Sequence, residues 1–174
     1  MHTSLLISVI ADDRPGLVDS LSAVVNDHGG NWLESNMSRL AGKFAGILRI
    51  DVSASDAAGL EAALQGLSSQ LDGLKLQIEQ LHADSEPLQE ASEALAIELV
   101  ANDRAGIVSE ISRTLAELQI NVESFSSFCE PAPMASGQLF RARLEIRMPN
   151  SLKRGELRAR LELLADDLML ELVD

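Results

Sequence analysis

The sequence predicts an α+β fold of two tandem βαββαβ units, each a four-stranded antiparallel sheet with two helices on one face. An internal duplication is the first reason, because residues 7–22 and 97–112 share seven identities. The second reason is periodicity, since apolar residues recur with helical spacing after each short apolar run and then alternate with polar residues. The 174 residues allow one ordinary domain or two small ones, and the duplication decides for two.

The first unit is predicted at residues 1–81 and reads strand, helix, strand, strand, helix, strand. Its first helix carries apolar residues at i, i+1, i+4, i+7 and i+8, and two glycines end it. A period of two then predicts two strands joined by a hairpin turn at residues 41–43. Ser55 or Asp56 is expected to cap the second helix. The predicted bounds are residues 4–11, 14–28, 31–40, 44–52, 56–72 and 74–81.

The second unit is predicted at residues 94–174 and repeats this order, with a longer hairpin loop at residues 130–137. Ser151 is expected to cap its last helix. Between the units, residues 82–93 hold one proline, two serines, four acids and no base, which is typical of a solvated linker. The predicted bounds in the second unit are residues 94–101, 104–118, 120–129, 140–148, 151–164 and 168–173.

The formal net charge of −13, from 27 acids and 14 bases, argues against a nucleic-acid partner, because DNA affinity depends on clustered Lys and Arg. The N-terminal apolar run is too short to span a membrane, and no basic segment precedes it. With a single cysteine, Cys129, no internal disulfide can form. We therefore expect a soluble, cytoplasmic protein that contacts neither nucleic acid nor membrane.

The sequence contains no phosphate-binding loop, dinucleotide fingerprint, zinc spacing or nucleophile elbow, so we expect no enzyme, no metal and no cofactor. The three histidines are scattered. His28 lies on the apolar stripe near a helix C-terminus, where a structural role is expected. The sequence indicates no general base that could activate Cys129 as a nucleophile, so it is expected to be a small core or interface residue.

The most informative stretch is Asp12-Asp13-Arg14-Pro15-Gly16-Leu17-Val18, which we call the first turn. Its repeat, the second turn, is Asn102-Asp103-Arg104-Ala105-Gly106-Ile107-Val108. Each turn leads from a strand into a helix, whose first N–H groups and dipole favour a carboxylate, and glycine allows a ligand to approach. Alternatively, Asp13 simply caps the helix. Both can hold together, but a cap alone does not explain why the whole pattern recurs.

In this βαββαβ context the pattern resembles the ACT domain, a ferredoxin-like module whose family binds amino acids and other small effectors at domain interfaces. The tandem arrangement resembles the glycine cleavage system transcriptional repressor family, on Asp-Arg-Pro-Gly-Leu-Val in the first turn and the loop Pro131-Ala132-Pro133-Met134 leading to Gly137-Gln138-Leu139-Phe140. The resemblance implies a regulatory protein that senses an amino acid, with glycine favoured. It also implies repression through a partner transcription factor, without a DNA-binding domain in the chain.

The resemblance places the effector in the two turns. By position, the ligand-binding residues are Asp12, Asp13, Arg14, Pro15, Gly16, Leu17 and Val18, then Asn102, Asp103, Arg104, Gly106, Ile107 and Val108. In ACT pairs the effector also touches the second strand of a neighbouring unit, which adds Asn31 and Asn121. Ala105 departs from the motif and Asn102 replaces an aspartate, so the sites are not equivalent and the first is preferred. The effector's carboxylate is expected on the amides of residues 15–18, with its ammonium on Asp12 or Asp13.

Two rival functions stay open. The chain is alternatively a regulatory ACT module or subunit that controls an amino-acid or one-carbon enzyme. A repressor that binds DNA directly needs a basic surface, and the nearest candidate is the alternating strand with Arg141, Arg143 and Arg147 beside the basic last helix. Such a face is more often solvated or used in dimer contact. Exposed strand edges also make a homodimer an expected assembly.

Overall fold

The computed structural model describes residues 2–81, 92–133 and 137–173, and the chain divides into two units, 1–87 and 88–174. Most of the predicted linker and part of the predicted loop at residues 130–137 lie outside the described residues. In the first unit the elements are β1 (His2–Asp12), α1 (Leu17–Asp27), β2 (Asn31–Leu40), β3 (Lys43–Ser53), α2 (Ala57–Gln70) and β4 (Lys75–Leu81). In the second unit they are β5 (Ser92–Asn102), α3 (Ile107–Glu117), β6 (Asn121–Pro131), β7 (Gln138–Pro149), α4 (Arg154–Glu162) and β8 (Met169–Val173).

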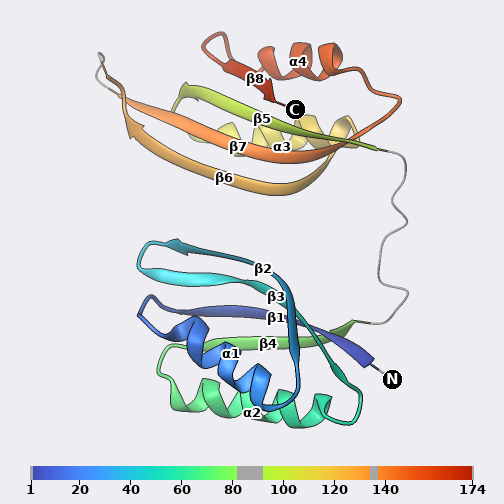
Figure 1. The fold of residues 1–174 in the computed structure, drawn as a ribbon. Helices are drawn as coiled ribbons and strands as arrows, with labels where there is room; N and C mark the ends of the chain where they lie inside the picture. The colour runs from blue at the N-terminus through green and yellow to red at the C-terminus, as the bar shows by residue number, and fades with distance from the viewer. Residues whose placement is uncertain (1, 82–91, 134–136, 174) are drawn as a thin grey trace. The chain divides into compact units, whose positions relative to one another are not determined.

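Each unit is a four-stranded antiparallel sheet covered on one face by two helices, as predicted (Figure 1). The strand order is β2-β3-β1-β4 in the first sheet and β6-β7-β5-β8 in the second. The first strand of each unit is therefore central, and it pairs on both sides. Strands β2 and β6 form one edge of their sheets. Because each turn directly follows the central strand, it lies at the middle of one end of its sheet.

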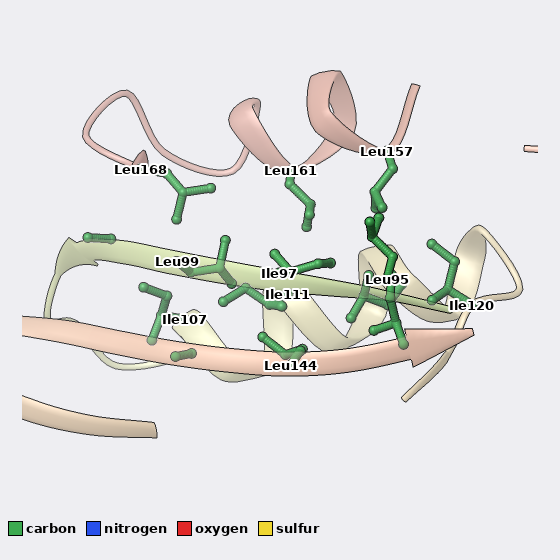
Figure 2. Close-up of a cluster of buried hydrophobic side chains, with 14 of the residues drawn as sticks. Leu95, Ile97, Leu99, Ile107, Ile111, Ile120, Leu144, Leu157, Leu161 and Leu168 are labelled. Carbon is green, nitrogen blue, oxygen red and sulfur yellow. The ribbon is translucent and has the colours of Figure 1, made fainter. Parts of the chain in front are cut away.

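The two cores are aliphatic and lie between each sheet and its helices. In the second unit, alternate residues of β5 and β7 meet the apolar stripes of α3 and α4, where Leu144, Ile111 and Leu161 are each 1% exposed or less (Figure 2). The first unit repeats this arrangement with β1, β3, α1 and α2. Burial of such aliphatic side chains stabilises the fold by roughly 1.5–3 kcal/mol each. No helix of the described segments is both long and apolar enough to cross a membrane.

The helices begin later than the sequence predicts. Helix α1 begins at Leu17 rather than residue 14, and α3 begins at Ile107 rather than residue 104. In each case the preceding glycine has a left-handed backbone, with φ of 85° at Gly16 and 91° at Gly106, and this conformation interrupts the helix. Helix α4 begins at Arg154 after Lys153, so Ser151 is not its cap.

Candidate functional site

The first turn is exposed at the end of its sheet. Residues 12–16 are all exposed, Leu17 is buried in the core, and Val18 is exposed again. The second turn has the same pattern, with Asn102 to Gly106 exposed, Ile107 buried and Val108 exposed. The predicted site residues of each turn other than Leu17 and Ile107 therefore lie on an accessible surface, and these two buried residues anchor their turns to the core.

Gly16 and Gly106 are required by the conformation of the backbone. A Cβ built on Gly16 has no atom within 4 Å, and one on Gly106 meets only the Glu110 carboxylate at 3.8 Å. Space does not explain these glycines, but the positive φ does, because L side chains rarely adopt it. Each glycine is the residue before its helix, and no side chain of the described residues caps either helix. The alternative in which Asp13 caps α1 is therefore wrong.

The helix starts leave N–H groups available. Ser20 N–H donates to the Gly16 carbonyl at 2.9 Å, whereas the N–H groups of Leu17, Val18 and Asp19 have no partner among the described residues. Pro15 has no N–H, so the predicted set of amides at residues 15–18 contributes fewer donors than its length suggests. The unpaired donors and the helix dipole make this corner favourable for a small anion.

Two bases from the β2–β3 hairpin hold the acids of the first turn. Lys43 donates to the Asp12 carboxylate, and Nε of Arg39 lies 2.6 Å from Oδ2 of Asp13. The Asp13 N–H also donates to the carbonyl of Gly42 in the hairpin turn, at 3.0 Å. The hydrogen bond and charge of Lys43 lower the pKa of Asp12 below its ordinary value. Sequence reasoning missed both bases, because they are distant in sequence and only the strand pairing brings them to the turn.

Arg14 differs from its repeat. Within the described part of the chain it makes no ion pair or hydrogen bond, and its charge acts on Asp12 only at longer range. Arg104 instead donates to both carboxylate oxygens of Glu110, with Nη1 at 2.9 Å from Oε1, and to the carbonyl of Leu164 at 3.3 Å. This pairing raises the pKa of Arg104 and lowers that of Glu110.

The other residues of the second turn also lie beside acidic side chains. The Asn102 N–H donates to Oδ2 of Asp167 at 2.7 Å, and this bond lowers the pKa of Asp167. Asp103 lies beside the Cys129 thiol, whose pKa is raised by desolvation first and by Asp103 next. Cys129 was expected to be a core or interface residue, and because it is exposed the core role is wrong. Two acids thus act on Arg104, namely Glu110 and Asp167, and Asp103 adds a third negative charge to this turn beside Cys129. In the first turn, by contrast, Asp12 and Asp13 each have a base as partner.

Asn31 and Asn121 do not join the turns of their own units. Asn31 pairs with Asp51, which pairs with Ser4, whereas Asp12 lies eight residues further along β1. At about 3.3 Å per residue the two ends are about 26 Å apart. The register of the second sheet separates Asn121 from Asn102 in the same way. These asparagines belong to a binding site only if another unit supplies the turn.

Neither of the two hollows found in the first unit contains a predicted site residue. One, of about 230 Å³, lies on the open face of the sheet near Glu34, Ile47 and Arg49. The other, of about 420 Å³, lies between the end of α1 and the start of α2, near His28 and Asp56. His28 donates from Nδ1 to the Val24 carbonyl at 2.9 Å, a contact that is structural. No group of three acidic, histidine or cysteine side chains in the described residues is placed to hold a metal ion.

The basic strand of the second unit is neutralised by its neighbours. Arg141 donates to Glu130, Arg143 to Glu98 at 2.6 Å, and Arg147 to Glu123 at 2.7 Å. A surface that releases counterions from DNA needs cations that are free to meet phosphates. These arginines instead form ion pairs across the strands, which weakens the case for direct DNA binding.

Comparison with known proteins agrees with the fold. A model of the ACT domain family matches residues 3–79, and a second ACT model matches residues 95–158. The chain is similar to a protein of unknown function from Galdieria sulphuraria, with a TM-score of 0.82, 26% identity and full coverage of both chains. It also shares its fold with a candidate glycine cleavage system transcriptional repressor, with a TM-score of 0.72, 20% identity, and coverage of 100% of this chain and 99% of that one.

A curated relative covers a smaller part of the chain. It is a UPF0237 protein of Methanopyrus kandleri, 32% identical over 56 residues, which are 32% of this chain and 62% of the relative. The chain thus spans less than two thirds of that relative's length.

Proposed function

Because the chain belongs to the ACT domain family through both of its units, we propose that it is an amino-acid sensor whose first turn binds glycine. The observation that carries this proposal is the composition of the first turn. Among the described residues, it presents amides without hydrogen-bond partners and a cation without an ion-pair partner, Arg14, beside two carboxylates whose charges are balanced by bases. An α-amino acid carries the complementary pair of charges within a few atoms.

In the proposed complex, the carboxylate of the amino acid accepts from the N–H groups of Leu17 and Val18 and from Arg14. Its ammonium donates to Asp12 or Asp13. The helix dipole contributes only about 0.3–2 kcal/mol, so the charged side chains must supply most of the affinity. With five heavy atoms at about 1.5 kcal/mol each, glycine reaches at most about 7.5 kcal/mol, which corresponds to roughly micromolar dissociation. Such a site responds to an abundant metabolite.

We propose further that the sensor represses transcription through a partner transcription factor and does not bind DNA itself. The net charge of −13 and the paired arginines of β7 support this view, because neither suits a phosphate backbone. The fold is shared with a candidate repressor of the glycine cleavage system, and the sequence pattern resembles that family. Binding of the amino acid would favour one arrangement of the chain over another and so alter the surface that the partner meets.

Calorimetry of the full chain with glycine, alanine and serine tests the sensor. We expect saturable heat with glycine, and no heat with any of the three would refute it. A gel shift with the purified protein alone tests the second proposal. A specific shift would favour direct DNA binding, whereas co-purification with an amino-acid or one-carbon enzyme would favour the enzyme-regulator alternative.

A further inference from the structure

We infer that the β2–β3 hairpin sets the ligand class of the first turn: Lys43 and Arg39 make it select zwitterions over simple carboxylates and simple amines, an inference that rests on the proposed binding of an amino acid there. These two bases come from a different part of the sequence than the turn itself. Their action makes them specificity residues of the site, in addition to the residues that the repeated motif supplies.

The hairpin contacts the turn at three points. The Asp13 N–H donates to the Gly42 carbonyl at 3.0 Å, which fixes the hairpin tip against the turn. On either side of this bond, Lys43 holds the Asp12 carboxylate and Arg39 holds that of Asp13. Strand pairing enforces this arrangement, because Asp12 and Lys43 are the last paired residues of β1 and β3 at this end of the sheet. Each acid thus has a base as its immediate neighbour.

A zwitterion can insert between Asp12 and Lys43 and leave every charge with a partner. Its ammonium donates to the Asp12 carboxylate in place of Lys43, and its carboxylate then accepts from Lys43 and the nearby amides. One ion pair is thereby replaced by two. Methylamine would displace Lys43 and leave that cation without a partner, whereas acetate would approach Asp12 and be repelled by it. The existing pairs therefore penalise a ligand that carries only one of the two charges.

The second turn lacks the two hairpin bases. At an offset of ninety positions, Asn102 replaces Asp12 and Cys129 replaces Arg39, and the residue that follows the hairpin glycine is Gln138 rather than lysine. The Asp103 N–H still donates to the hairpin, to the Gln138 carbonyl at 2.8 Å, so the backbone contact is kept. The charges are not kept. We therefore assign one zwitterion site to each chain, in the first unit.

The test compares glycine with its two halves, acetate and methylamine, on the full chain. Chemical shifts of the Leu17 and Val18 amides, followed during titration, report binding at this turn. We expect glycine to bind about tenfold or more tightly than either half. Lys43→Gln should weaken glycine about tenfold and leave methylamine binding unchanged or stronger, because Lys43 then no longer competes with the ammonium for Asp12, while Lys43→Arg should retain the selectivity. Lys75→Gln, the same change at an exposed lysine of β4, is the matched control.

Equal affinity for glycine and acetate in the natural protein would overturn the inference while leaving the turn as an anion site. Unchanged glycine affinity in both Lys43→Gln and Arg39→Gln would also overturn it and leave the proposed sensor intact. If glycine fails to shift the Leu17 and Val18 amides at all, both proposals fall together. Should Lys43→Gln disturb folding, seen by circular dichroism, Arg39→Gln gives the same comparison.

Discussion

The two turns have the same backbone but different electrostatic surroundings. Both contain Asp-Arg-x-Gly, both put the glycine at positive φ, and both expose five residues before a buried apolar one. Around the first turn, two hairpin bases balance the acids, and Arg14 has no ion-pair partner in the part of the chain that the structure describes. Around the second, Glu110 engages Arg104, and Asp103 and Asp167 add negative charge. The repeated residues thus fix the geometry, and we expect residues outside the motif to determine which turn binds an anion.

One substitution explains much of this difference. Ser20 of α1 corresponds to Glu110 of α3 at the same offset. Ser20 donates from its hydroxyl to the Gly16 carbonyl, so it leaves Arg14 alone. Glu110 reaches back and binds Arg104 with both carboxylate oxygens. A motif search that compares only residues 12–18 with 102–108 therefore overstates the functional likeness of the two units.

The largest expected effect is on ligand affinity, where Arg14→Gln should weaken glycine about tenfold to a hundredfold. A charge-assisted hydrogen bond contributes roughly 1.5–3 kcal/mol, and this variant removes one from the proposed complex. Arg104→Gln is the matched control in the second unit and should leave the dissociation constant unchanged, because that guanidinium already serves Glu110. Isothermal calorimetry measures both. A loss of affinity in Arg104→Gln alone would reverse the assignment of the site.

The fold was predictable from sequence because periodicity and the duplication are properties of the chain itself. The order of elements is confirmed, and the strand ends lie within two residues of the prediction. The site was only partly predictable. The motif located the turn, but Lys43 and Arg39 come to it through strand pairing across β1, β3 and β2. Asn31 was assigned by resemblance to a site whose turn a neighbouring unit supplies, and the register puts it at the opposite end of the sheet from the turn of its own unit.

Helix starts were the least accurate feature, for a physical reason. Apolar periodicity predicted a helix that begins at residue 14, with Gly16 open to a ligand and Asp13 as an alternative helix cap. The left-handed conformation of Gly16 moves the start to Leu17, and Arg39 takes the Asp13 carboxylate that a cap would need. A glycine immediately before an apolar helix stripe can be required by its φ alone, and residue spacing does not distinguish this role from that of admitting a ligand.

The next effect concerns what the turns share. Gly16→Ala and Gly106→Ala should each lower the free energy of unfolding of their unit by about 1–2 kcal/mol, since an L residue at positive φ is strained by that amount. The two losses should be equal, because neither new methyl group meets a close atom. Urea unfolding followed by amide signals of each unit measures them. A loss confined to one unit would show that the two backbones are not equivalent. Gly66→Ala, in the interior of α2 with open space around its Cβ, is the control and should stabilise slightly.

A smaller effect distinguishes the contacts at Asp13 and Asp103. Cys129 stands where the first unit has Arg39, and its thiol pKa lies above the ordinary value through desolvation and through Asp103. Asp103→Asn should lower that pKa only part of the way, because desolvation is the larger cause. The rate of alkylation by iodoacetamide as a function of pH measures the change. Asp166→Asn, which removes the charge of another exposed acid of the second unit, serves as the control. No change in the profile would mean that Asp103 does not face the thiol in solution.

The smallest expected effect is the dependence of stability on acid, which should differ between the units. The folded-state pKa values of Asp12, Glu110 and Asp167 are all lowered, so each carboxylate stabilises its unit above its unfolded pKa and loses that contribution as pH falls through the folded one. The second unit holds two of these acids and the first holds one, so the second should lose more stability below about pH 4. Arg104→Gln should flatten this acid limb in the second unit by removing the main cause of the Glu110 shift, and Lys43→Gln should do the same for Asp12 in the first. Amide signals followed through an acid titration separate the units, and an identical acid limb in both would contradict the unequal charge surroundings on which the comparison rests.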